Sequence, residues 1–227
     1  MTKTVRMIDT STLAWGDWHP QFPGTLSKEL HFDAGTGANL RQAYLPPGFT
    51  IAERERHHHG NTREGVFILF GNIPYHEYDL PTTTEGSLYD FRKGFLLDRT
   101  PRSIHGISLN PTSELGCMIL EWGTGPLEFN YIPFEGDLTS FGTDFNAPHT
   151  ADSESQSWTP HPDLPGCKIK ILSDGGDAVD PRFHPVCLVH IPPGWAPANT
   201  VYRGSVQDKR RWLYVLHGDA PVWTYPD

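Results

Sequence analysis

The eight residues HHHGNTRE, at positions 57–64, carry the pattern that decides the fold of this chain. Side chains on a β-strand alternate between its two faces, so His57 and His59 lie on one face and His58 lies on the other. A tight turn then brings Glu64 in from the neighbouring strand. We therefore expect two imidazoles and one carboxylate to converge at the end of a strand.

A third histidine, His105, follows Gly94 and Pro101 at the end of another predicted strand. Two imidazoles two residues apart, a carboxylate and a distant imidazole can converge on one ion. Three neutral nitrogens and one anionic oxygen suit Fe(II), Mn(II), Ni(II), Zn(II) or Cu(II), and an octahedral ion would keep open positions. The predicted metal ligands are His57, His59, Glu64 and His105.

The spacing of these residues resembles the first motif of the cupin superfamily, which has the form G-x5-HxH-x3,4-E-x6-G. The match from the first histidine to the last glycine is complete, and it consists of His57, His59, Glu64 and Gly71. The upstream glycine departs from the motif, because eight residues rather than five separate Gly48 from His57.

The second cupin motif, G-x5-PxG-x2-H-x3-N, is matched more loosely. Gly94, Pro101, His105 and Asn110 occur in the right order, but Ser103 stands at a glycine position and the spacings differ by a residue. The resemblance implies an all-β fold, the cupin double-stranded β-helix, which is a jelly-roll-like barrel. It also implies one divalent metal ion per chain, with Fe(II) favoured and Mn(II), Zn(II) or Ni(II) as alternatives.

Strand-like segments bounded by turn residues recur along the chain, and no amphipathic helix of three turns is found. The predicted strands cover residues 42–45, 50–58, 65–70, 88–91, 95–98, 116–122 and 127–132. Residues 142–157 are polar and aperiodic, which is typical of a linker or a long surface loop.

One pattern occurs twice, on either side of this linker. The matching pairs, in the same order, are HPQFPG (19–24) with HPDLPG (161–166), LPPGF (45–49) with IPPGW (191–195), and VFILFGNIPYHEY (66–78) with LYVLHGDAPVWTY (213–225). Such repetition indicates a duplicated β unit. We expect a metal-binding cupin domain at 1–141, a linker at 142–157, and a partial, degenerate second cupin repeat at 158–227 that packs on the first.

The second copy lacks the predicted metal ligands, because Val206 and Arg211 stand where His59 and Glu64 stand in the first copy. Its segments 187–191 and 212–216 have the composition of buried strands. An incomplete repeat leaves a strand edge without a partner, which a second subunit could cover through a two-fold axis. We therefore expect a homodimer.

The composition excludes several classes of function. Acidic residues outnumber basic ones by 27 to 18, and the net charge of −9 disfavours nonspecific binding to nucleic acid or to an anionic membrane. Apolar runs are too short to span a membrane, and the first residues lack a signal-peptide core. The three cysteines form no CxxC pair, so we expect reduced thiols and a cytoplasmic protein. The abundant glycines and prolines, 22 and 21, favour short strands.

Strand parity also indicates what lies near the ion. An apolar wall is expected on the side of Glu64, formed by Val66, Ile68 and Phe70. Three polar residues are candidates for catalysis: Glu55, as an acceptor for an imidazole N–H or as a general base, His76 and Glu121. Parity places no arginine toward the site, so an anionic substrate is not expected.

The leading functional hypothesis is a mononuclear metal-dependent oxidoreductase, a dioxygenase acting on a small oxygenated molecule such as an enol, diketone, hydroxyketone or phenol. One alternative is non-redox chemistry, in which an isomerase, lyase or decarboxylase uses the metal as a Lewis acid. Another alternative is a metal-bound ligand-sensing module. The fold alone does not separate these functions.

Overall fold

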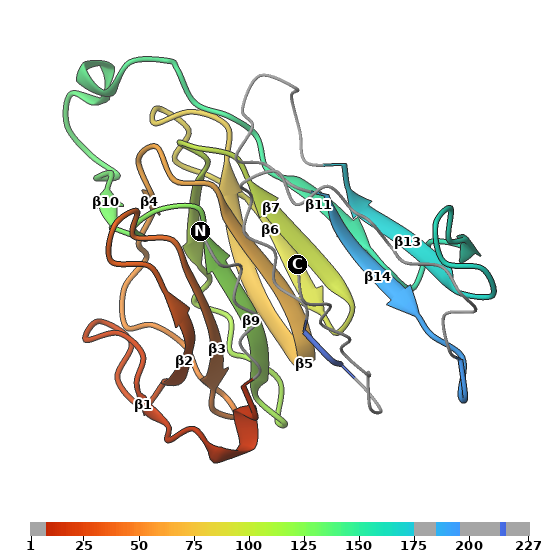
Figure 1. Ribbon diagram of the computed structural model, residues 1–227. Coiled ribbons are helices and arrows are strands. Elements are labelled where there is room, and N and C mark those ends of the chain that lie inside the picture. The colour runs from red at the N-terminus through yellow and green to blue at the C-terminus, as the bar shows by residue number, and fades with distance from the viewer. Residues whose placement is uncertain (1–7, 175–184, 196–213, 217–227) are drawn as a thin grey trace. The chain divides into compact units, whose positions relative to one another are not determined.

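The computed structural model describes residues 8–174, 185–195 and 214–216 (Figure 1). The chain divides into two compact units. One comprises residues 9–154, and the other comprises residues 155–227 together with residues 1–8. Within the described ranges, no helix has both the length and the apolar character needed to cross a membrane.

The unit of residues 9–154 is built almost entirely from antiparallel strands, and its described helices are two short 3-10 turns, η1 (Thr10–Thr12) and η2 (Leu138–Phe141). The strands are β1 (Gly16–Asp17), β2 (Leu26–Phe32), β3 (Asn39–Leu45), β4 (His57–His58), β5 (Glu64–Tyr78), β6 (Ser87–Arg92), β7 (Phe95–Arg99), β8 (Ile104–Ile107), β9 (Cys117–Gly123), β10 (Asn130–Tyr131) and β11 (His149–Asp152). Neighbouring strands follow the order β1-β2-β3-β9-β5-β8-β4-β10, with β6 and β7 also paired to β5 (Figure 1).

Strand β5 is the centre of this unit because it takes part in two layers. Its first half pairs with β9 and β7, and its second half pairs with β6 and β8. The change of layer follows Gly71, whose φ of 69° lies in the left-handed region. A Cβ atom at this position would overlap with the carbonyl oxygen of Gly116, so the glycine of the first motif meets both a conformational and a steric requirement.

The interior of the barrel is an apolar core that includes Val66 and Ile68, as strand parity predicts. The prediction for Phe70 is wrong, because this side chain is 42% exposed. The register between β5 and β9 shifts between Ile68 and Phe70. An extra residue at a bulge reverses the faces of the residues that follow it, so Phe70 leaves the interior.

Several predicted elements have different bounds in the structure. The expected strand over 50–58 is reduced to β4, and the one over 127–132 is reduced to β10. The linker expected over 142–157 contains β11, which pairs with β7, and the two units divide after Glu154. The linker prediction is therefore wrong for residues 149–152. Those residues are polar because β11 is largely exposed.

The described part of the second unit is a three-stranded antiparallel sheet of β12 (Thr159–Pro160), β13 (Lys168–Ser173) and β14 (Val186–His190). Its pairing repeats that of β1, β2 and β3, including the position of an irregularity. The register shifts between Glu29 and His31 on β2, and between Ile171 and Ser173 on β13, which are equivalent positions of the two copies.

The turns of the two copies also share their hydrogen bonds. The backbone N–H of Gln21 donates to Nδ1 of His19, and that of Asp163 donates to Nδ1 of His161 in the same way. The ammonium group of Lys28 lies 4.5 Å from the ring centre of Trp15, and that of Lys170 lies 4.7 Å from that of Trp158. These equivalent contacts support a duplicated unit.

Some expectations for the second copy lie outside the described residues, among them the substitutions at Val206 and Arg211. The strand expected at 187–191 is present as β14, but its side chains are half-buried to exposed rather than buried. Residues 214–216 are described and form no strand. All three cysteines are free thiols.

Candidate metal centre

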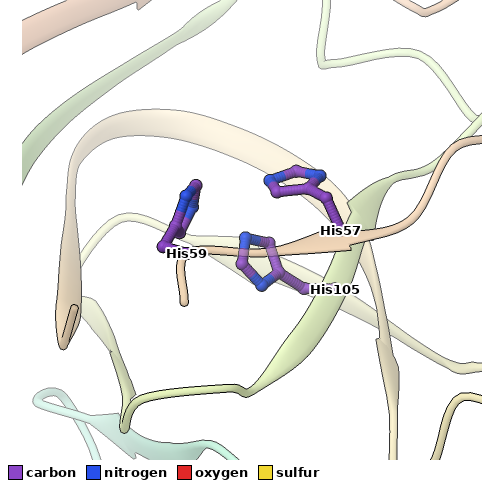
Figure 2. A group of neighbouring side chains, drawn as sticks. All are labelled: His57, His59 and His105. Atoms are coloured by element: carbon purple, nitrogen blue, oxygen red, sulfur yellow. The ribbon is translucent and has the colours of Figure 1, made fainter. Parts of the chain in front are cut away.

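Three histidines from two segments that are distant in sequence lie close together (Figure 2). His57 lies on β4, His59 directly follows this strand, and His105 lies on β8 opposite His57 in the antiparallel register. One ring nitrogen from each lies within 4.8 Å of the others, and all three side chains are buried. Figure 2 shows the three rings pointing toward one another. The three-histidine group could hold a metal ion.

The hydrogen bonds around the rings determine which nitrogens are available. Nδ1 of His57 lies 2.6 Å from Oε2 of Glu55, and Nδ1 of His59 lies 3.0 Å from the carbonyl oxygen of Glu128. Nδ1 of His105 lies 3.2 Å from the carbonyl oxygen of Ser103. Carbonyl and carboxylate oxygens only accept, so all three rings carry their proton on Nδ1. This leaves the Nε2 atoms to face the site, and a metal ion requires them without a proton.

Burial supports the same protonation state for two of the rings. Burial lowers the pKa of His57 despite the nearby Glu55 carboxylate. The pKa of His105 lies well below its usual value, because burial and then the positive charge of Arg99 disfavour the imidazolium. Burial acts in the same direction on His59, but the carboxylate of Glu64, the carbonyl group of Glu128 and the charge of Glu121 together outweigh it and raise the pKa. Glu64 therefore favours protonation of His59, and a metal ion would have to displace that proton.

Glu64 lies beside the three histidines, but its strand is not the direct neighbour of the strand that carries His57, contrary to the prediction from the sequence. Strand β5 does not pair with β4, since β8 lies between them. The carboxylate oxygens of Glu64 are 3.6 Å from Nε2 of His59 and 3.4 Å from Nε2 of His105. Burial by itself would raise the pKa of Glu64, yet Arg99 and these imidazoles hold it well below its usual value. Glu64 is therefore an anion that faces the site.

Arg99 was missed by the reasoning from sequence, and the expectation that no arginine faces the site is wrong. Its Nη1 donates to Glu64 at 2.8 Å, while Nε and Nη2 donate to one oxygen of Glu77 at 3.2 and 2.6 Å. Arg99 is almost completely buried and lies over the ring of Tyr75. Strand alternation could have predicted the inward direction of Arg99, because Leu97 of the same strand is in the core and Arg99 follows two residues later.

The three candidate catalytic residues have different surroundings. Glu55 contacts His57 directly and also accepts the backbone N–H of Ile107 at 2.9 Å, so it positions an imidazole. A glycine next to His105 permits this contact, since a Cβ at Gly106 would overlap with the backbone of Glu55. His76 is not brought to the site. It alternates with the buried Tyr75 and Glu77, and its Nδ1 lies 3.3 Å from the carbonyl oxygen of Gly86.

Glu121 is buried beside Glu64, and its Oε2 lies 2.9 Å from Nε of Arg41. Burial, together with the charge of Glu64, raises the pKa of Glu121 even though Arg41 opposes the shift. Arg41 is a second arginine that contacts a carboxylate next to the site, and its side chain is 26% exposed.

The remaining histidine of the HHH run lies on the other face, as alternation predicts. Nδ1 of His58 accepts the backbone N–H of Gly60 at 3.0 Å, and its ring packs against Phe145.

The departure of the second motif from its usual form at Ser103 has a local explanation. Arg102 has a φ of 65°, so the left-handed residue of this turn precedes Ser103, where the motif has glycine.

Comparisons with known proteins give neither a family model nor a curated protein that matches this sequence. Solved structures do match. A predicted oxalate decarboxylase from Thermotoga maritima is 16% identical with a TM-score of 0.41, over 52% of this chain and 97% of that one. An RmlC-like cupin from Shewanella frigidimarina is 13% identical with a TM-score of 0.38, over 56% of this chain and 95% of that one.

A variant of oxalate decarboxylase from Bacillus subtilis is 15% identical with a TM-score of 0.49, and the match covers 76% of this chain. The present chain spans about half of that protein, 55% of its length. The order of the strands, the layer change of β5 at the motif glycine and the pairing of His57 with His105, which joins the two motifs, give the conclusion on the fold. Residues 9–154 form a cupin β-barrel that carries a three-histidine group able to hold a metal ion.

Proposed function

We propose that this protein is a mononuclear metal-dependent oxidoreductase, a dioxygenase that acts on a small oxygenated molecule such as an enol, diketone, hydroxyketone or phenol. The observation that carries the proposal is that the Nδ1 atoms of His57, His59 and His105 all contact oxygen acceptors, which favours one shared tautomer. Three neutral Nε2 donors suit Fe(II), which would supply reactivity toward O2 when bound.

The surrounding residues have separate parts in this proposal. Glu55 and the two carbonyl groups hold the rings in one orientation, so little reorganisation is needed when the site is loaded. Glu64 provides negative charge, and Arg99 fixes its carboxylate. Val66 and Ile68 follow Glu64 on strand β5 and belong to the apolar core. In this proposal, that apolar surface excludes water from the side of the site on which Glu64 lies.

The test is oxygen consumption by protein loaded anaerobically with Fe(II), screened against enolisable and phenolic compounds. We expect uptake with at least one compound, and no uptake with Zn(II)-loaded protein or with Fe(II)-treated His59→Ala. A complete lack of uptake across the screen, with a stoichiometric and tight Zn(II) complex, would count against the proposal.

The second candidate is non-redox chemistry by an isomerase, lyase or decarboxylase, and one observation favours it. Glu121 is buried beside the ionised Glu64, and burial together with that charge raises its pKa, which favours the acid form of a carboxyl group near the site. The test is product formation without oxygen by Zn(II)- or Mn(II)-loaded protein. Turnover that is lost in Glu121→Gln, while metal content is kept, would identify this class.

A further inference from the structure

The three histidines have an aromatic neighbour that no motif includes. The ring of Phe129 lies 4.2 Å from that of His57 and 5.2 Å from that of His59, measured between ring centres. Phe129 follows Glu128, whose carbonyl oxygen accepts from His59, so its backbone is fixed next to the site. The ring also packs against the barrel core.

Phe129 is the central member of a row of three rings, which we name the aromatic rim: His19, Phe129 and Tyr131. The ring centres are 4.4 Å apart between His19 and Phe129 and 5.8 Å apart between Phe129 and Tyr131, and both pairs are stacked at interplanar angles of 30°. The rim reaches solvent, because Tyr131 is 40% exposed whereas His57 is only 3% exposed.

The pairing of β10 with β4 directs the rim toward the site. Tyr131 lies opposite His57 in the antiparallel register, and directly opposed residues place their side chains on the same face. The ring centres of Tyr131 and His57 are 5.7 Å apart. Burial and the nearby Glu55 carboxylate raise the pKa of Tyr131 to about 12, so its hydroxyl remains neutral.

The other neighbours of the histidines are the buried ring of Tyr75, whose centre lies 6.1 Å from that of His105, and a group of charged side chains. Glu64 and Arg99 form a buried ion pair there, and Glu121 lies beside them. A ligand next to the three histidines would therefore meet the partly exposed rings of Phe129 and Tyr131 on the side of β10, and mostly charged groups on the side of β5 and β9. This asymmetry suits a molecule whose oxygen atoms are attached directly to a flat ring.

We propose that Phe129 and Tyr131 determine specificity, and that they select ligands in which a planar conjugated ring carries the oxygen atoms directed at the three histidines. This inference rests on the proposed function, because it requires a metal ion at the three histidines. Aromatic stacking against this pair favours a ring-bearing ligand over its aliphatic counterpart by about tenfold.

Two hydroxamates isolate the contribution of the ring, because benzohydroxamate and acetohydroxamate have the same metal-binding group. Their dissociation constants are measured with Co(II)-loaded protein from the visible spectrum of the ion. We expect benzohydroxamate to bind about tenfold more tightly. Phe129→Leu and Tyr131→Leu should each reduce this preference and leave Co(II) content and acetohydroxamate affinity unchanged. Tyr89→Leu, an exposed aromatic on β6, is the matched control and should keep the preference.

The outcomes separate this inference from the proposed function. Protein that takes up Co(II) and binds both hydroxamates equally refutes the rim and leaves the metal site in place. A ring preference that persists in both leucine variants also refutes it. Absence of Co(II) binding overturns both proposals. If Phe129→Leu does not fold, Tyr131→Leu decides the matter, because its side chain is exposed.

Discussion

The substitution Glu55→Gln tests how the histidines are prepared for a metal ion. Oε1 of Glu55 accepts the backbone N–H of Ile107, and Oε2 contacts Nδ1 of His57 at 2.6 Å. Glutamine can keep the first contact through its oxygen. Its NH2 group then faces Nδ1 and favours the tautomer with the proton on Nε2, which is the nitrogen that an ion needs.

Losing a carboxylate partner of a ligating imidazole weakens metal affinity by about 10- to 100-fold, which corresponds to roughly 1.4–2.8 kcal/mol. We expect Glu55→Gln to fall in this range. The matched control is Glu53→Gln, because Glu53 is exposed, lies two residues away and undergoes the same change of charge. This control should bind as the unmodified protein does.

The assay is competition for Zn(II) against a chromophoric chelator of known affinity at pH 7, accompanied by thermal unfolding of the metal-free proteins. Glu55→Gln should lose affinity while its fold remains intact. Equal Zn(II) affinities for the two glutamine variants would show that the Glu55–His57 contact does not prepare the site, and the assignment of the tautomers would be wrong.

Four further outcomes are expected. His59→Ala should remove most of the bound metal, whereas His58→Ala should keep it, as measured by elemental analysis. Arg99→Met should lower the free energy of unfolding by about 3–5 kcal/mol in chemical denaturation, because it leaves two buried carboxylates without a counter-ion. Gly71→Ala should cost at least about 2 kcal/mol in the same assay, since its φ is positive and its Cβ would overlap with backbone. Burial and the positive charge of Arg102 lower the pKa of His58 to about 4, so the folded state favours the neutral ring. The free energy of unfolding should therefore decrease as the pH falls from 6.5 to 4, and it should decrease less steeply in His58→Gln.

The shared face of His57 and His59 could be predicted because it depends on a local rule, whereas His105 was identified through the order of residues in the second motif. Alternation along a strand separates His58 from His57 and His59, and the motif spacing identifies Glu64 and Gly71. The burial of Val66 and Ile68 follows from the same parity. Phe70 could not be placed in this way, because a bulge is set by the pairing with β9 and leaves no pattern in the sequence of β5.

The surroundings of the site depend on contacts between distant segments. The carbonyl groups of Glu128 and Ser103 orient two imidazoles, and a backbone carbonyl has no signature in sequence. Arg99 was accessible to parity but lies one residue beyond the predicted strand. The aromatic rim depends on the pairing of β10 with β4, which joins residues more than 70 positions apart in sequence. Strand β10, which Phe129 precedes, has only two residues, so its pairing could not be predicted from the sequence.

The repetition along the chain is supported by the structure at the level of single contacts. The same register shift, the same histidine turn and the same stacking of lysine on tryptophan occur in both copies. Of these features, the histidine turn was detectable in the sequence as HPQFPG and HPDLPG, because turn residues specify local backbone geometry. How the second copy is completed, and whether the protein forms the expected homodimer, remain predictions.

The central claim is that His57, His59 and His105 hold one divalent metal ion, and the direct measurement is the metal content of protein purified without a histidine tag. Elemental analysis after loading and desalting should give about one ion per chain, and His59→Ala prepared in parallel should give little. Retention of iron or manganese, which are redox-active, would favour oxygen chemistry. Retention of stoichiometric zinc would favour the non-redox alternative. Unmodified protein that retains no metal, or a His59→Ala variant that retains as much, would contradict the account.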